Sequence, residues 1–169
     1  MGYFCALMNV SEEFELDVNA EIIWAKITLP KRNSLHICSF YRPPDSSTDP
    51  ILQLQTSLNS LISRSTEFPN IILMGDFNFP NIAWSDGSGQ LNLCPTYGTE
   101  LNSLFLDVIN DVGLEQFVTS STRNNHVLDL VFSTYSTITD LNIVPGMSDH
   151  KAITFQVDIG LTTAKQNTK

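Results

Sequence analysis

Polar side chains able to do acid–base or metal chemistry follow four apolar segments of the sequence. These side chains are Tyr41, Asp76, Asn78, Asp129, Asp149 and His150. Carboxylates and carboxamides supply the oxygen ligands that hard divalent cations need. An imidazole beside a carboxylate can act as a general base. The residue types therefore point to acid–base chemistry, with a divalent cation as a natural companion.

One of these segments is an apolar run, residues 71–74, that stops at Gly75-Asp76-Phe77-Asn78. A short apolar run bounded by turn formers is typical of a buried strand. Asp76 and Asn78 stand at alternate positions, so both side chains can point the same way at the strand's end. Ligand sites of α/β folds lie at the carboxyl ends of strands. An Asx-type turn without function explains the same residues equally well.

Asp129 lies within the apolar stretch Val127–Phe132, where a carboxylate is costly unless it has a partner. His150 is one natural partner, because an Asp–His pair fixes the imidazole tautomer and leaves the other ring nitrogen as a base. Loop amides or Arg123 are the structural alternatives for Asp129. The Asp149-His150 dipeptide is otherwise only part of a Gly- and Ser-containing loop.

These residues must be positioned by strands and helices whose patterns are visible in the sequence. Apolar residues at three- and four-residue spacing predict one helix that begins near Asp49 and Pro50, and a second from Thr99 to Val112 that Gly113 ends. Strands are predicted over 21–29, 35–41, 71–74, 114–118, 127–132, 138–144 and 152–157. Strands mixed with two separated helices indicate a mixed α/β (α+β) layered fold.

The remaining stretches carry weaker patterns. Residues 1–20 are weakly patterned, 79–98 are expected to form a long irregular loop, and 160–169 form a polar tail. The predicted domain therefore spans residues 21–159. The chain has 169 residues, of which 42% are hydrophobic, so one domain with a real core is expected.

The net charge of −9 argues against broad electrostatic attraction to nucleic acid, although a small basic site or a bound cation can reverse the field locally. Cys5, Cys38 and Cys94 are widely spaced and odd in number, which favours a reducing compartment and an intracellular location, nuclear or cytoplasmic. No apolar run approaches the roughly 18 residues of a membrane span, so no membrane partner is expected.

Four motifs occur in one order over roughly residues 20–158. They are Tyr41-Arg42-Pro43-Pro44, Gly75-Asp76-Phe77-Asn78, Thr122-Arg123 with Leu128-Asp129-Leu130-Val131-Phe132, and Ser148-Asp149-His150. Together they resemble the endonuclease/exonuclease/phosphatase superfamily. The closest likeness is to the apurinic-type endonuclease domain of non-LTR retrotransposons, and Trp84 also fits that subgroup.

The resemblance implies a four-layer αββα sandwich and Mg²⁺-dependent (or Mn²⁺-dependent) hydrolysis of a phosphodiester or phosphomonoester. It implies that His150 acts as the base or acid–base group at the scissile bond, that Asp129 orients it, and that Asp76 positions the attacking water. Asn78 and Tyr41 would contact the phosphate. Asp149 would help to bind the metal. Arg42 and Arg123 are candidates for phosphate or DNA contacts, with surface solvation as the alternative.

One part of the family's pattern finds no match. The principal metal-binding Glu, and an Asn before it, precede the Tyr-containing strand in the family. None of the acids before Tyr41 can be matched to that Glu, and Pro44 stands where the family often has Asn. The sequence is therefore expected to correspond to the C-terminal two-thirds of the domain, without its first strands.

The expected function is a metal-dependent endonuclease that nicks DNA for retrotransposition, impaired by truncation. An intact element would also carry a reverse transcriptase domain. The alternatives are a non-catalytic retroelement remnant and a small-molecule phosphoesterase of the same fold. Oligomeric state and target preference do not follow from the sequence.

Overall fold

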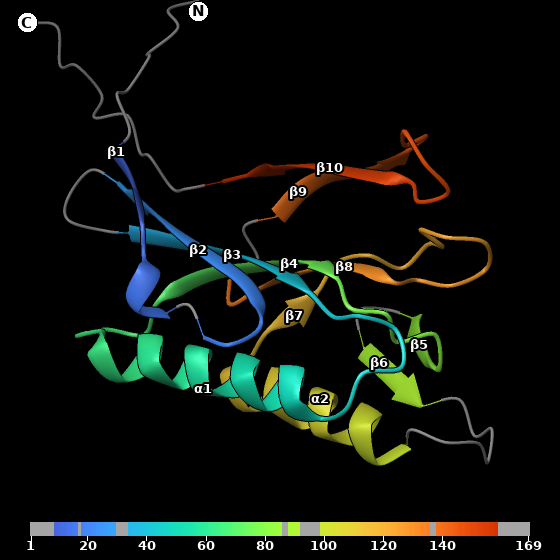
Figure 1. Cartoon of the computed structure of the whole chain (residues 1–169). Coiled ribbons are helices and arrows are strands. Elements are labelled where there is room, and N and C mark those ends of the chain that lie inside the picture. The colour runs from blue at the N-terminus through green and yellow to red at the C-terminus, as the bar shows by residue number, and fades with distance from the viewer. Residues whose placement is uncertain are drawn as a thin grey trace, which may run out of the picture.

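The computed structural model describes residues 9–16, 18–29, 34–85, 88–91, 99–135 and 138–158. Its elements form three layers (Figure 1). Two helices lie on one face of a six-stranded sheet, and a two-stranded sheet lies on the other. The predicted mixed α/β fold is thereby confirmed, with one helix layer and two sheet layers in place. Cys38 is buried in the core, while Cys5 and Cys94 fall outside the described residues.

The large sheet has the strand order β1-β2-β3-β4-β8-β7. Its strands are β1 (Asn9–Glu12), β2 (Glu21–Thr28), β3 (Ser34–Tyr41), β4 (Asn70–Asp76), β7 (Glu115–Gln116) and β8 (Asp129–Ser133). Only β3 and β4 pair in parallel among these strands. The strand β1 lies within the stretch that was expected to be weakly patterned. Its four exposed residues have no apolar alternation that a sequence pattern could detect. A short 3-10 helix, η1 (Phe14–Leu16), follows it.

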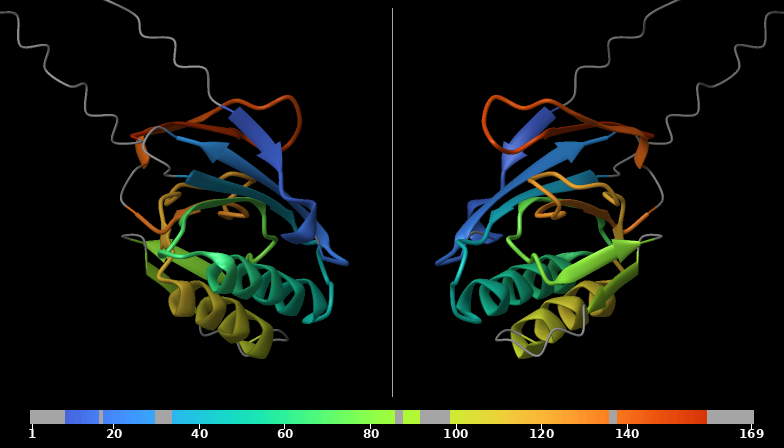
Figure 2. Two further views of the ribbon diagram at one scale, coloured as in Figure 1. Left: turned by 90° about the vertical axis from the view of Figure 1, so that its left-hand side faces the viewer. Right: turned by 90° about the vertical axis from the view of Figure 1, so that its right-hand side faces the viewer.

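Both predicted helices are present, as α1 (Asp49–Arg64) and α2 (Thr99–Val112). They lie side by side under the large sheet (Figure 2). The apolar face of α1 is buried at Ile51, Leu54, Leu58 and Leu61 and partly buried at Ile62, as the spacing of its apolar residues predicts. Gly113 has a φ of +67° and ends α2, since its N–H reaches back to the Asn110 carbonyl. The chain then turns directly into β7, so the strand expected over 114–118 is shorter than predicted.

A second, smaller core lies between the large sheet and the antiparallel pair β9 (Ile138–Val144) and β10 (Ala152–Val157). Its fully buried members include Ile72, Val118 and Val131. In Figure 1 this pair lies above the large sheet, on the side opposite the helices. The loop that joins β9 to β10 carries Asp149 and His150, so this second layer brings the histidine to the edge of the first.

The stretch expected to be a long irregular loop contains a β-hairpin, β5 (Ile82–Ser85) and β6 (Ser88–Leu91). Trp84 explains why this segment forms a hairpin, because its side chain is only 6% exposed and packs edge-on against Phe132. A buried aromatic residue anchors a segment whose Asn-, Ser- and Gly-rich composition is typical of loops. Across the described residues, none of the helices is long and apolar enough to cross a membrane.

Candidate active site

Three of the predicted site residues lie in one row across the large sheet. The strand register pairs Tyr41 on β3 with Asp76 on β4, and Asp76 with Asp129 on β8. Residues paired in this way share a face of the sheet. The row stands on the face that the β9–β10 layer covers, at the end of the sheet where β3 and β4 finish. The alternation of polar and apolar residues in the sequence therefore positions two carboxylates and a phenol together.

His150 joins this row from the β9–β10 loop. Its Nδ1 atom lies 2.9 Å from the Asp129 Oδ2 atom, and both side chains are mostly shielded from solvent. The backbone next to His150 is anchored, because the Lys151 N–H donates to the Thr122 carbonyl. Of the two explanations for Asp129, the structure supports the partnership with histidine, while Arg123 pairs elsewhere.

Asp76 and Asn78 form a tight turn at the end of β4. Asn78 has a φ of +52°, and its N–H donates to the Asp76 Oδ1 atom at 3.2 Å. The Asn78 carboxamide donates to the Arg42 carbonyl at 2.8 Å, which ties this turn to the chain that leaves β3. An Asx turn and a site at these residues are therefore compatible, since the turn holds Asp76 at the end of the row and fixes Asn78 next to it.

Thr122 holds Asp129 in place, and the sequence reasoning missed this role. The Thr122 side chain is fully buried, and its hydroxyl accepts hydrogen bonds from the N–H groups of Leu128 and Asp129. The signal was available in the Thr122-Arg123 motif, which had been considered only for its arginine. Thr122 thus connects the loop before β8 to the carboxylate that holds His150.

Thr122→Val is expected to lower the free energy of unfolding by about 1–3 kcal/mol, because two buried N–H groups lose their acceptor. Thr122→Ser keeps the hydroxyl and is expected to lose much less. Urea unfolding of the two variants would measure the difference. Equal stability of the valine and serine variants would contradict the positioning role.

The Asp76 carboxyl group has an elevated pKa. The largest cause is burial, which disfavours the charged form, and the neighbouring Asp129 carboxylate adds to it. His150 and the hydrogen bonds from Asn78 act in the opposite direction without cancelling the rise. The folded chain therefore holds the Asp76 proton more tightly than the unfolded chain does.

This pKa has a consequence for stability. Because the folded-state pKa lies above the unfolded value, ionisation of Asp76 costs stability as the pH rises through this interval. Asp76→Asn removes that charge and keeps the Oδ1 acceptor for the Asn78 N–H. In metal-free buffer we expect this variant to melt at a higher temperature than the wild type at pH 7. The advantage should disappear in acid, where the wild-type carboxyl is protonated. A lower melting temperature at pH 7 would contradict the sign.

Arg42 does not face the substrate side, which corrects the expectation of a phosphate contact. It is only 4% exposed, and its guanidinium donates to the carbonyls of Phe77, Asn78 and Ser46. It also lies over the Phe79 ring, 4.5 Å from the centroid. The physical reason is that the turn after β4 leaves carbonyl groups without partners, and a buried arginine satisfies several of them at once.

Asp149 and Arg123 form an exposed ion pair with a separation of 2.6 Å. The hydrogen bond from Arg123 is the main reason that the pKa of Asp149 is lowered. The structure thus does not bring Asp149 into the group formed by Asp76, Asp129 and His150, and the metal role expected for it finds no support in this arrangement. Arg123 remains at the surface, 41% exposed, near the His150 loop.

A cavity of about 260 Å³ opens between the two sheets beside the row. Asp76, Asp129 and Lys151 supply its charged lining, and Ile153 and Phe155 on β10 contribute apolar walls. Lys151 is a cation that the sequence reasoning overlooked. The Lys151 ammonium donates to the Ser121 carbonyl at 3.0 Å, and its position directly after His150 was the available signal.

The donor set fits a divalent cation. One ligand atom from each of Asp76, Asp129 and His150 lies within 4.8 Å of the others. Two carboxylates held this close repel each other, and this repulsion adds to the effect of burial, which is the larger cause of the raised pKa of Asp76. A hard cation would relieve the repulsion, with the carboxylate oxygens as its preferred ligands.

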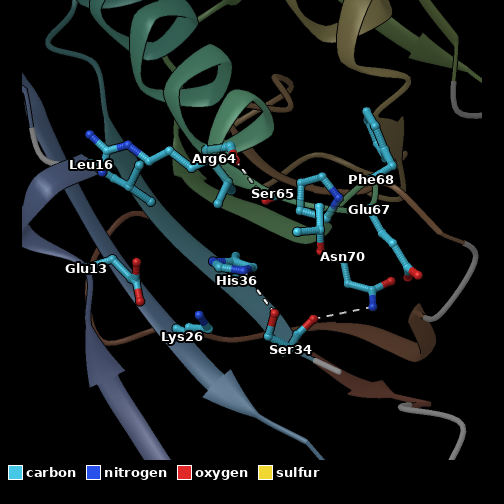
Figure 3. Close-up of a pocket in the computed structure, with 13 residues that line it drawn as sticks. Glu13, Leu16, Lys26, Ser34, His36, Arg64, Ser65, Glu67, Phe68 and Asn70 are labelled. Carbon is cyan, nitrogen blue, oxygen red and sulfur yellow. Dashed lines mark hydrogen bonds between the residues drawn. The ribbon is translucent and has the colours of Figure 1, made fainter. Parts of the chain in front are cut away.

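A second cavity, of about 330 Å³, lies at the opposite end of β3 and does not belong to this site (Figure 3). His36 lines it, and its Nε2 atom lies 3.1 Å from the Ser34 hydroxyl. Burial and the nearby Lys26 lower the pKa of His36. This histidine is therefore held neutral in the core, away from Asp76 and Asp129.

Solved structures share this fold. A 3′ phosphatase from Neisseria bound to a product DNA hairpin matches with a TM-score of 0.58 and 14% identity, over 90% of this chain and 72% of that one. An endonuclease/exonuclease/phosphatase from Beutenbergia cavernae matches with a TM-score of 0.56 and 11% identity, over 92% and 45% of the two chains. An AP endonuclease from Archaeoglobus fulgidus gives a TM-score of 0.51 and 13% identity, over 80% and 65%.

These likenesses show an endonuclease/exonuclease/phosphatase fold, in which the present chain spans roughly half to three quarters of each matched chain. A search of curated protein sequences found no match. The family model described as endonuclease-reverse transcriptase matches residues 35–154, more than two thirds of the chain. That stretch runs from β3 to β10 and contains every residue of the site. The chain belongs to the endonuclease-reverse transcriptase family, within the endonuclease/exonuclease/phosphatase superfamily.

Proposed function

We propose that this chain is the catalytic part of a divalent-metal-dependent phosphodiesterase that nicks DNA. The observation that carries the proposal is the grouping of Asp76, Asp129 and His150, with His150 held at 2.9 Å by Asp129. Hydrolysis of a phosphate ester needs an aligned water, a base and compensation of the developing negative charge. Each need has a candidate at this edge of the sheet.

The side chains would divide the work as follows. His150, with Nδ1 tied to Asp129, would present its other ring nitrogen to the substrate as acid or base. Asp76 would orient the attacking water. The Asn78 carboxamide and the Tyr41 hydroxyl would donate to the phosphate oxygens, and Tyr41 is 45% exposed and so available to a ligand. Lys151, which lines the cavity beside the row, and Arg123, which pairs with Asp149 in the neighbouring loop, could meet a DNA backbone.

A divalent cation, Mg²⁺ or Mn²⁺, would be held by the carboxylates of Asp76 and Asp129. When bound, it would neutralise charge on the phosphate and favour ionisation of water. Asp149 would become a ligand of this cation only if its ion pair with Arg123 were broken. Two carboxylates are few for a tightly bound Mg²⁺, so we expect weak metal affinity and correspondingly impaired activity from the residues described.

The biological role we propose is target nicking in a retroelement, where the nick primes a reverse transcriptase domain of the same element. The description of the matching family, endonuclease-reverse transcriptase, supports this role. DNA as substrate is also in line with the Neisseria phosphatase, whose structure contains a product DNA hairpin.

Incubation of the purified chain with supercoiled plasmid would test the proposal. We expect nicked circles whose yield rises with Mg²⁺ concentration and disappears with a chelator. The absence of nicks at every Mg²⁺ and Mn²⁺ concentration, from a chain shown to be folded, would favour a non-catalytic remnant instead.

A second candidate is hydrolysis of small phosphoesters, and the net charge of −9 favours it because an acidic surface repels DNA. Release of inorganic phosphate from small phosphomonoesters, measured beside plasmid nicking, would distinguish the two. Phosphate release without nicks would replace the DNA proposal.

A further inference from the structure

Arg42 and the turn that ends β4 are joined by hydrogen bonds in both directions. The Arg42 Nη1 atom donates to the carbonyls of Phe77 and Asn78, at 3.3 and 2.9 Å. In return, the Asn78 carboxamide donates to the Arg42 carbonyl at 2.8 Å. The Arg42 N–H also donates to the Asp76 carbonyl at 2.9 Å. Each of the three residues from Asp76 to Asn78 is therefore bonded to Arg42, and the first and last of them carry chemistry in the proposed function.

This turn has a backbone conformation that most residues avoid. Asn78 has a φ of +52°, in the left-handed region, which asparagine adopts only occasionally. A residue in this region stays there only when its surroundings hold it. In this conformation the Asn78 N–H reaches the Asp76 Oδ1 atom. The positions of the Asp76 carboxylate and the Asn78 carboxamide therefore depend on the contacts that keep the turn in place.

The Arg42 guanidinium is itself fixed well enough to supply those contacts. The residue is only 4% exposed, and its guanidinium lies over the Phe79 ring. The Nη2 atom donates to the Ser46 carbonyl in the loop after β3, at 3.4 Å. The guanidinium thus bonds both to the chain that leaves β3 and to the turn that ends β4. Burial of a charge is costly unless hydrogen bonds satisfy it, and two of the three carbonyls that do so belong to the turn.

We propose that Arg42 is a positioning residue of the active site, which holds the Asp76–Asn78 turn so that both side chains can act on the substrate. The inference rests on the proposed function and deepens it. Arg42 touches neither the DNA nor the metal ion and acts only through Asp76 and Asn78. Its loss should therefore slow the chemical step and leave the affinity for DNA unchanged, whereas the loss of a phosphate contact would weaken DNA binding.

Arg42→Lys tests this role, because lysine keeps the positive charge and loses the planar fork that bonds several carbonyls at once. In the plasmid-nicking assay, we expect kcat to fall about tenfold to a hundredfold, since a displacement on the order of 1 Å at the reacting groups can cost that much. The KM for plasmid should change by less than about twofold. The matched control is Arg64→Lys on α1, where an exposed arginine pairs with Glu15, and it should leave both constants unchanged.

Amide hydrogen exchange follows the turn itself and needs no catalysis. In metal-free buffer, the Asn78 N–H should exchange at least about tenfold faster in Arg42→Lys than in the wild type, because its bond to Asp76 opens more often. Amides on the buried face of α1, such as that of Leu58, should keep their rates, which separates a loosened turn from a general loss of stability. Phe79→Leu removes the ring beneath the guanidinium and keeps the arginine, so it should change kcat and the Asn78 exchange in the same directions by smaller factors.

Wild-type kcat and wild-type Asn78 exchange in folded Arg42→Lys and Phe79→Leu would overturn the positioning role. A higher KM with an unchanged kcat in Arg42→Lys would also overturn it, and would make Arg42 a DNA contact. If the wild-type chain produced no nicks, the proposed function would fail, and the Asn78 exchange in the variants would alone decide whether Arg42 holds the turn.

Discussion

Gly75→Ala is expected to lower the free energy of unfolding by at least about 3 kcal/mol, which places it among the largest effects of a single substitution. Gly75 pairs with Phe40 in the parallel register of β3 and β4. A Cβ atom at position 75 would lie 1.8 Å from the Phe40 carbonyl oxygen and 2.8 Å from its carbon. Gly75 also has a φ of +147°, which L-residues rarely adopt. Backbone atoms of a central strand cannot move aside cheaply, so both effects act together.

Gly113→Ala is the matched control. Gly113 also has a positive φ, +67°, but a Cβ atom there would meet nothing within 4 Å. Its substitution should cost only the backbone strain of a left-handed residue, about 1–2 kcal/mol. Urea unfolding of both variants separates the steric clash from the strain. If the two substitutions had equal cost, the close approach of β4 to the Phe40 carbonyl would be wrong.

The same glycine shows what a sequence pattern can convey. The apolar run before Gly75-Asp76 predicts a buried strand and its end, because burial and turn formation depend on residue type alone. The close contact with Phe40 depends on which strand lies next to β4 and in which register. That information is tertiary, and no spacing within residues 71–78 carries it.

In the candidate site too, the features that depend on residue type were predictable, and those that depend on tertiary neighbours were not. The pairing of Asp129 with His150 was predictable, because a carboxylate in an apolar strand requires a partner. Arg42 was misjudged, since an arginine next to prolines in a polar loop gives no sign that the chain folds over it. The carbonyls that it satisfies belong to Phe77 and Asn78, which are distant in sequence. Thr122 was missed for the same reason, as its acceptor role is defined by where β8 begins.

Three strands, β1, β5 and β6, were not predicted from the sequence. The β5–β6 hairpin is anchored by Trp84 against Phe132, and the composition around it is that of a loop. The strand β1 pairs with β2 through its backbone and buries none of its own side chains. Backbone pairing with an existing edge needs no hydrophobic alternation, so periodicity could not reveal it.

His150→Ala is expected to reduce the rate of plasmid nicking by about 10²–10⁴-fold, the usual contribution of a general acid or base. The ring is bonded to the Asp129 carboxylate, so its removal should also lower the stability of the chain modestly, and the rates are therefore compared at a temperature at which both variants are folded. The matched control is His126→Ala. His126 is an exposed histidine in the neighbouring loop, and its ring contacts the Pro80 carbonyl rather than a carboxylate. Nicking rates of the two variants, measured at equal Mg²⁺ concentration, provide the comparison.

Asp129→Asn tests whether the two residues act as one unit. A carboxylate at position 129 accepts the Nδ1 proton and leaves the other ring nitrogen of His150 unprotonated. A carboxamide can instead donate to Nδ1 and favour the opposite tautomer, which cannot accept a proton from the reaction. Asp129→Asn should therefore lower the rate about as far as His150→Ala, and the double variant should be no slower than either, because groups that act as a unit are not additive. Additive losses would mean that Asp129 serves the metal ion or the fold independently of the histidine.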